Sequence, residues 1–73
     1  MKSIDLHGRT VAEAVAVFED WLNRSRMDGK LIEIQFIVGT GKIMDRLKEL
    51  ATREGLYAYV PMANRGCLVI EFE

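Results

Sequence analysis

Apolar residues recur along this chain with two different periods, and the order in which these periods alternate limits the folds that the chain can adopt. Two stretches carry apolar residues at intervals of three and four, which is typical of helices that bury one face: residues 10–28 and 43–54. Four shorter stretches alternate in polarity or are rich in β-branched and aromatic residues, which is typical of strands: residues 3–6, 31–38, 56–60 and 67–72. The predicted order of elements is therefore βαβαββ.

The first predicted helix has a sequence signal at each end. Thr10 followed by Glu13 forms a capping box, in which each side chain bonds the backbone N–H of the other residue. Gly29 suits the left-handed backbone position that commonly follows the last residue of a helix. These signals predict a helix that begins just after Thr10 and ends just before Gly29.

Two helices can cover only one face of a four-stranded sheet. Glu33 and Gln35 alternate with apolar residues in the second predicted strand, so one face of that strand should meet water. A helix joins the first two strands, which should therefore be parallel neighbours. We predict one domain over residues 1–73, an α/β two-layer sandwich with a four-stranded mixed sheet and two helices on one face.

Length and charge exclude several classes of protein. The 73 residues have room for one small domain, and their net charge of -1 excludes a strongly cationic nucleic-acid clamp while leaving room for a local basic patch. The single cysteine, Cys67, cannot form an internal disulfide, which favours the reducing cytoplasm. We expect no membrane partner, because the sequence has no apolar run of the roughly 18 residues that a span needs, and no signal peptide, because Met1-Lys2-Ser3 leads directly into an alternation of apolar and polar residues.

Two predicted strand-to-helix loops should meet at one edge of the sheet. The first contains His7 and Gly8 and the second is Gly39-Thr40-Gly41, so both follow the carboxyl ends of parallel strands, where α/β sheets bind ligands. A helix that starts beside glycines can present free N–H groups to a phosphate. Three cations lie in or beside these loops: Arg9, Lys42 and Arg46. The second loop is not a P-loop, because Phe36 stands where that motif requires glycine.

Several motifs of this chain match a known family in order: Ile4-Asp5-Leu6-His7-Gly8 with Thr10-Val11 and Glu13-Ala14, then Val38-Gly39-Thr40-Gly41, Arg46, and Ala63-Asn64-Arg65-Gly66. Over nearly the whole chain these segments resemble the Smr (small MutS-related) domain family. That resemblance implies a fold like the C-terminal domain of translation initiation factor three, with the fourth strand between the second and the third. The chain looks like a stand-alone domain of this kind.

The resemblance implies binding of DNA or RNA, and several Smr domains nick or cleave these substrates. Their nuclease motif maps onto residues 4–7, which makes Asp5 and His7 the catalytic candidates. The expected nucleic-acid-binding residues are those of the glycine turn and the nearby cations: Arg9, Gly39, Thr40, Gly41, Lys42, Arg46 and Arg65. Val38 replaces the usual His or Thr of the family, which weakens the case for cleavage more than the case for binding. A nuclease could also need Mg²⁺ or Mn²⁺, whose ligands the sequence does not identify.

Alternatives stay open for these residues and for the function. Asp5 could orient the His7 imidazole as an acid–base group, or it could anchor the loop by accepting backbone N–H bonds. Arg46 could bind phosphate or pair with Glu49. Tyr57 and Tyr59 share one face of a strand, where they could stack on bases or mediate a homodimer. The function is either a DNA or RNA endonuclease or a non-catalytic nucleic-acid or ribosome-associated binding module.

Overall fold

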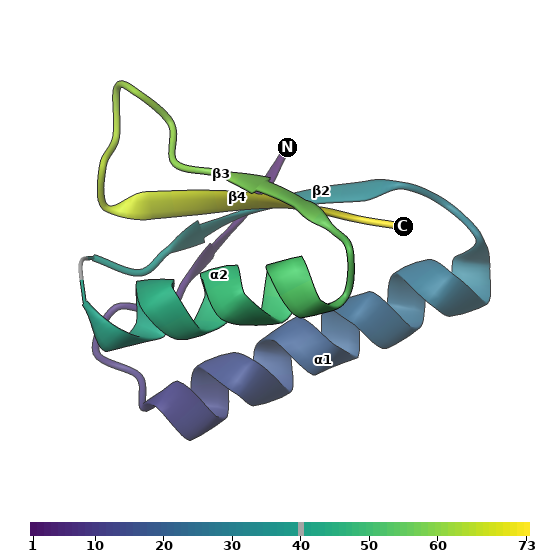
Figure 1. The fold of residues 1–73 in the computed structure, drawn as a ribbon, viewed down its shortest axis with the longest axis horizontal. Coiled ribbons are helices and arrows are strands. Elements are labelled where there is room, and N and C mark those ends of the chain that lie inside the picture. Colours follow the sequence, from purple (N-terminus) through teal and green to yellow (C-terminus); the bar gives the residue numbers. More distant parts are fainter. Residues whose placement is uncertain (40) are drawn as a thin grey trace.

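The computed structural model describes residues 1–39 and 41–73, and its elements follow the predicted order (Figure 1). They are β1 Lys2–Asp5, α1 Val11–Asp28, β2 Ile32–Ile37, α2 Lys42–Arg53, β3 Tyr57–Tyr59 and β4 Cys67–Phe72. Thr40, which was expected to contribute to binding, lies outside the described residues.

The four strands form one mixed sheet in the order β1-β2-β4-β3. β1 runs parallel to β2, with Ile4 opposite Phe36. β4 runs antiparallel to both of its neighbours and lies between β2 and β3. Both the parallel pairing and the position of β4, which the family resemblance implied, are confirmed.

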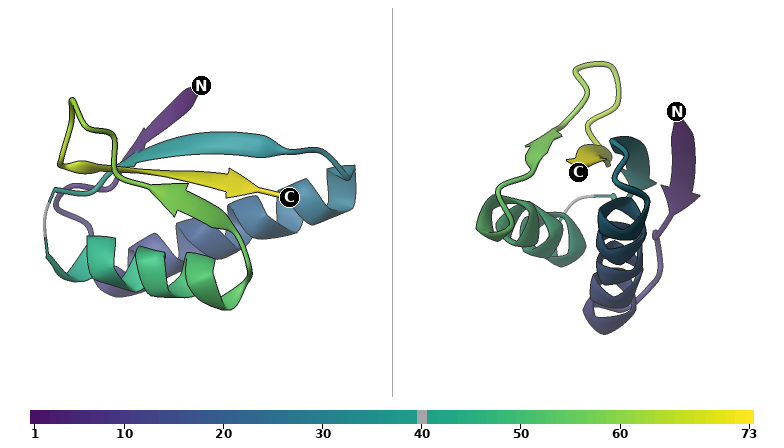
Figure 2. Two further views of the ribbon diagram at one scale, coloured as in Figure 1. Left: turned by 45° about the horizontal axis from the view of Figure 1, so that its top comes forward. Right: turned by 90° about the vertical axis from the view of Figure 1, so that its right-hand side faces the viewer.

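Both helices pack on the same face of the sheet, so the predicted two-layer sandwich is confirmed (Figures 1 and 2). The core lies between the layers and contains residues from both helices, from β2 and β4 and from the loops after β1 and β2, among them Leu6, Phe18, Phe36, Leu47 and Phe72. The Phe72 ring contacts two other rings, at centroid distances of 5.3 Å to Phe18 and 6.1 Å to Phe36. Such tilted and edge-on ring pairs add to the stability that apolar burial provides.

The ends of α1 match the sequence signals. The Thr10 hydroxyl accepts a hydrogen bond from the Glu13 N–H, and the Glu13 carboxylate accepts one from the Thr10 N–H. Gly29 adopts the left-handed conformation, with φ of 66°, and its N–H donates to the Ser25 carbonyl. The capping box fixes the first turn of α1, and with it the loop that follows β1.

Two apolar residues of the helices pack against the border of the core. Trp21 is half-buried there, with the Lys2 ammonium 5.7 Å and the Arg24 guanidinium 4.9 Å from its ring. Ile43 is also half-buried against the core, next to the buried Met44. Among the described residues, neither helix is long and apolar enough to cross a membrane.

Candidate functional site

The loop after β1 is a tight turn held by backbone bonds. The Arg9 N–H donates to the Leu6 carbonyl, and buried Leu6 fixes the start of the loop in the core. Gly8 adopts a positive φ of 83°, which a side chain would disfavour. The Asp5 carboxylate accepts a hydrogen bond from the His7 backbone N–H at 2.8 Å. Asp5 therefore has the loop-anchoring contact that the sequence left open as an alternative.

The loop after β2 is held by the segment that leads into β4. The N–H groups of Val38 and Gly39 both donate to the Gly66 carbonyl oxygen at 2.9 Å. Gly66 lies beside Gly39: an added Cβ atom on Gly66 would be in ordinary van der Waals contact with the Gly39 Cα, at 3.6 Å. The Gly39 N–H is therefore already used within the protein and is not free for a phosphate. The same packing brings the loop that contains Arg65 to the edge where β1 and β2 end.

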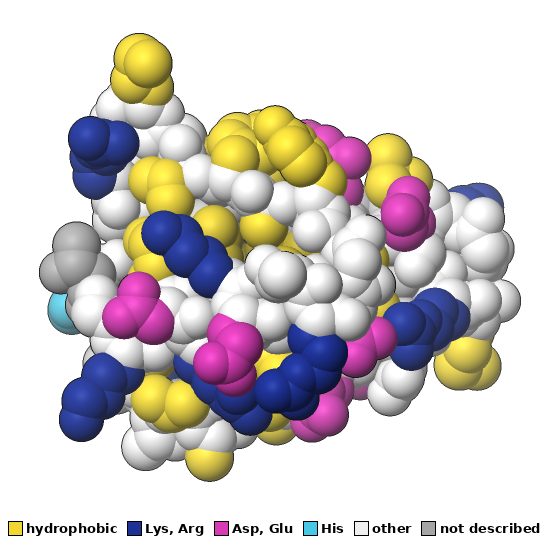
Figure 3. All heavy atoms as spheres, in the orientation of Figure 1, with side chains coloured by type: hydrophobic (Ala, Val, Ile, Leu, Met, Phe, Trp, Pro, Cys, Tyr) yellow, Lys and Arg dark blue, Asp and Glu magenta, His cyan; other side chains and the backbone are white. Residues whose placement is uncertain are grey.

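The two loops meet, as the parallel pairing of their strands predicted. A Cβ atom on Gly39 would lie 3.7 Å from the His7 Cδ2, so the imidazole stands directly beside this glycine. Between the loops lies an open pocket of about 620 Å³, which we call the loop pocket; its lining residues are His7, Gly8, Arg9, Thr10, Val11, Val38, Gly39, Lys42 and Ile43. Figure 3 shows His7, the single histidine of the chain, at the left rim of the molecule.

The N-terminus of α2 opens toward the same edge. Gly41, the residue before the helix, has a φ of 107°, and no side chain of the described residues caps the first turn. The free N–H groups of this turn and the positive end of the helix dipole favour an anion here. Lys42 begins α2 and adds a full positive charge beside the loop pocket, whereas Asp45 in the same turn opposes it.

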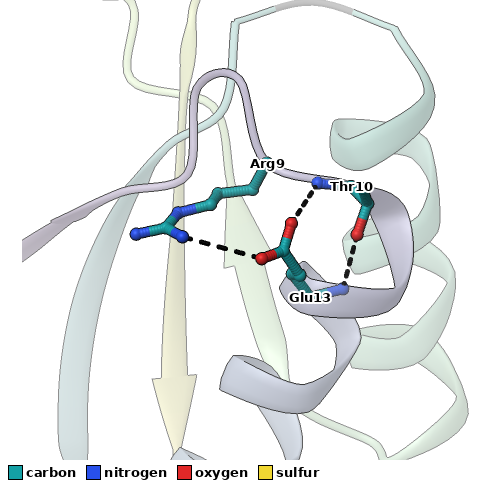
Figure 4. A network of polar contacts seen from close by, with 3 residues as sticks. All are labelled: Arg9, Thr10 and Glu13. Atoms are coloured by element: carbon teal, nitrogen blue, oxygen red, sulfur yellow. Dashed lines mark hydrogen bonds and ion pairs between the residues drawn. The ribbon is translucent and has the colours of Figure 1, made fainter.

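Arg9 is tied to the capping box of α1. Its guanidinium lies 3.6 Å from Glu13 Oε2, while the other carboxylate oxygen of Glu13 accepts from the Thr10 N–H (Figure 4). The hydrogen bonds from Thr10, aided by the charge of Arg9, hold the pKa of the Glu13 carboxyl below its usual range. The Arg9 and Glu13 side chains are 61% and 52% exposed, so this pair is weak enough for Arg9 to exchange a carboxylate for a phosphate.

The other expected cations differ in their surroundings. Arg46 does not line the loop pocket; its guanidinium pairs with Glu49, which also lies 3.6 Å from Arg53. Arg65 is exposed in the loop that packs against Gly39. Within the described part of the chain, the edge therefore gathers Arg9, Lys42 and Arg65, while Arg46 is committed to its own helix.

Asp5 and His7 are adjacent in the fold, but they face different hollows. Asp5 lines a smaller pocket of about 270 Å³ together with Arg9 and Glu13, whereas His7 lines the loop pocket. Residues 1–39 and 41–73 contain no group of three or more His, Cys, Asp or Glu side chains that could hold a metal ion.

Two apolar residues of the loop pocket were not predicted as part of the site: Val11 and Ile43 form part of its lining from the first turns of the two helices. Val38, which the second motif placed in the site, also lines the pocket while being only 5% exposed. The sequence did contain a signal, because the first turn of each helix follows directly on a loop of the site. Their side chains make part of the loop pocket hydrophobic, which the pattern of charges in the sequence does not reveal.

Comparison with known proteins finds the same fold elsewhere. No protein-family model matches the chain, and no curated protein sequence matches it. The crystal structure of the Smr domain of Thermus thermophilus MutS2 is similar over 100% of this chain and 99% of that chain, with a TM-score of 0.78 and 24% sequence identity. The chain therefore has the fold of an Smr domain.

Proposed function

We propose that the protein binds nucleic acid through the loop pocket and its rim. The observation that carries this proposal is the convergence of Arg9, Lys42 and the uncapped N-terminus of α2 on one open pocket. The phosphates of nucleic acids accept hydrogen bonds from cationic side chains and from the free N–H groups at helix N-termini. The similarity of the fold to the MutS2 Smr domain supports the same function.

The charge distribution sets the strength of this binding. A molecule of net charge -1 does not attract a polyanion as a whole, so affinity depends on the few cations at this edge. Arg9, Lys42 and Arg65 can neutralise about three phosphates, which gives a log–log salt slope of about -2.7 on duplex DNA and about -2.1 on a single strand. Binding is therefore weak to moderate and falls steeply with salt.

The test is a binding measurement with charge-matched variants. Fluorescence anisotropy of labelled single-stranded, duplex and branched DNA, and of structured RNA, gives the affinities at low salt. Arg9→Ala/Lys42→Ala should abolish most of the binding. Lys30→Ala/Lys48→Ala makes the same change in net charge at exposed residues outside the loop pocket, and should bind like the parent. Equal loss in both double variants would refute the proposed site.

Cleavage of a phosphodiester bond is the second candidate function, and the position of His7 favours it. The imidazole lines the loop pocket beside Gly39, where it could transfer a proton to or from a bound phosphate ester. Asp5 acts on the backbone of this loop rather than on the imidazole. Binding is the better supported function. The pocket supplies cations and N–H groups that can bind a phosphate, but within the described residues no second acid–base group contacts His7.

Cleavage is tested with supercoiled DNA and structured RNA, each with and without Mg²⁺ or Mn²⁺. If the protein is a nuclease, His7→Ala should lower the rate by about 10²–10⁴-fold and leave binding largely intact. Asp5→Asn keeps the shape of the side chain and an oxygen acceptor for the His7 N–H, so it should retain most of the activity. Activity that survives His7→Ala would exclude this residue as the catalyst. If the parent protein cleaves neither substrate, the protein is a non-catalytic binding module.

A further inference from the structure

The face of the sheet opposite the helices has no covering layer (Figures 1 and 2). The strand register places three rows of side chains on it: Glu33, Glu71 and Tyr57; Ser3, Gln35, Val69 and Tyr59; and Asp5, Ile37 and Cys67. Val69 and Cys67 are buried within this face, while Tyr57 is 61% and Tyr59 36% exposed. This face is therefore open to solvent at the two tyrosines, whereas Val69 and Cys67 are covered by their neighbours.

The charged side chains of this face are all acidic. Its strand positions carry Asp5, Glu33 and Glu71 and neither Lys nor Arg. Glu33 and Glu71 stand directly opposite each other on β2 and β4, and both are only partly exposed. Like charges at directly opposed positions destabilise a sheet. The chain thus keeps an unfavourable pair on the open face of the sheet, near the start of β2 and the end of β4.

The two tyrosines form one cluster with this pair. Tyr57 lies directly opposite Glu71, and the Tyr57 and Tyr59 ring centroids are 5.5 Å apart. Desolvation, followed by the nearby charges of Glu33, Tyr57 and Glu71, raises the pKa of the Tyr59 phenol. We call these four residues, Glu33, Tyr57, Tyr59 and Glu71, the acidic tyrosine face. Along the upper edge of Figure 3, where the sheet lies in Figure 1, hydrophobic side chains adjoin acidic ones.

We propose that the acidic tyrosine face is a docking surface for a segment of a partner protein rich in Arg and Lys. A guanidinium or ammonium between Glu33 and Glu71 would turn their mutual repulsion into two attractive contacts. The exposed face of Tyr57 offers the flat surface on which an arginine stacks. Both kinds of contact select the same chemistry, a cationic side chain in an extended segment.

Other occupants fit this surface less well. The phosphates of a nucleic acid would be repelled by the carboxylates, so the tyrosines are unsuited to stack on bases. A second copy that docked through the same face would bring Glu33 and Glu71 against themselves. The acidic pair also lies at the opposite end of β2 from the loop pocket, about 17 Å away along the strand. A cationic segment and a nucleic acid could therefore bind at the same time.

The test is an NMR titration of the ¹⁵N-labelled protein with the peptide Arg-Gly-Arg-Gly-Arg at low salt. Saturable shifts are expected at Glu33, Tyr57, Tyr59 and Glu71. Glu33→Gln/Glu71→Gln should weaken binding by about tenfold and should not lower the Tm, because it removes a repulsion. The control Glu19→Gln/Asp28→Asn removes the same charge from exposed positions on α1 and should bind like the parent.

Several outcomes would overturn the proposal. They are equal weakening in both double variants, peptide shifts spread over α1 and α2, and the absence of saturable shifts. Shifts at the four residues that depend on protein concentration, without peptide, would identify a second copy as the occupant and refute the cationic segment. None of these results depends on whether the loop pocket binds nucleic acid.

Discussion

Lys42→Ala should flatten the salt dependence of nucleic-acid binding by the equivalent of one phosphate contact. Lys42 is the first residue of α2 and lines the loop pocket together with Arg9, and Arg65 lies in the neighbouring loop. Three contacts on duplex DNA give a slope of about -2.7, and two give about -1.8. Between about 50 and 200 mM salt, the affinity should fall about 40-fold for the parent and about 12-fold for Lys42→Ala.

The assay is fluorescence anisotropy of one labelled duplex at four or more salt concentrations. Lys48→Ala is the matched control, because Lys48 is an exposed lysine of the same helix that does not line the loop pocket. Its slope should equal that of the parent. Identical slopes for the parent and Lys42→Ala, or equal flattening by Lys48→Ala, would show that phosphates contact another surface.

Four further predictions follow from the contacts around the loop pocket. Arg46→Ala should change the salt slope by less than half as much as Lys42→Ala, because Arg46 already pairs with an acid on its own helix; an equal change would place phosphate at Arg46. Thr10→Ala should lower the unfolding free energy by about 1 kcal/mol in urea titrations, as the loss of an N-cap does. The Glu13 carboxylate should contribute separately: the difference in stability between the parent and Glu13→Gln should be present at neutral pH and shrink as the pH falls through the lowered pKa of Glu13, because the protonated carboxyl then accepts the Thr10 N–H bond no better than an amide does; a difference independent of pH would contradict it. Gly39→Ala should lower the unfolding free energy by about 1–2 kcal/mol, because φ is 67° there, and an unchanged Tm would show that the turn relaxes.

The order of elements could be predicted from the sequence because each boundary has a local cause. The capping box, Gly29 and the alternation of polarity in β2 act over a few residues, and the structure confirms all three. The position of β4 between β2 and β3 depends on long-range pairing, and it was expected from the family resemblance rather than from the residues themselves.

The position of the candidate site in the fold could be predicted from the sequence, but the contacts that its residues make could not. Parallel pairing of β1 and β2 was enough to bring His7 beside Gly39. The sequence could not reveal that the Gly66 carbonyl occupies the Gly39 N–H, because Gly66 comes from a loop distant in the chain. It also left the partners of Asp5 and Arg46 open, since each side chain had two chemically reasonable acceptors or donors within reach.

The most direct test of the proposed function is an NMR titration of the ¹⁵N-labelled protein with a short single-stranded oligonucleotide at low salt. The proposal predicts saturable shifts at the loop pocket, in the amides of His7, Gly8, Gly39 and Lys42, that weaken as salt is added. The amides of Tyr57 and Glu71, on the open face of the sheet, should not move. Shifts centred on those two residues, or no shift at the loop pocket at low salt, would contradict the proposal.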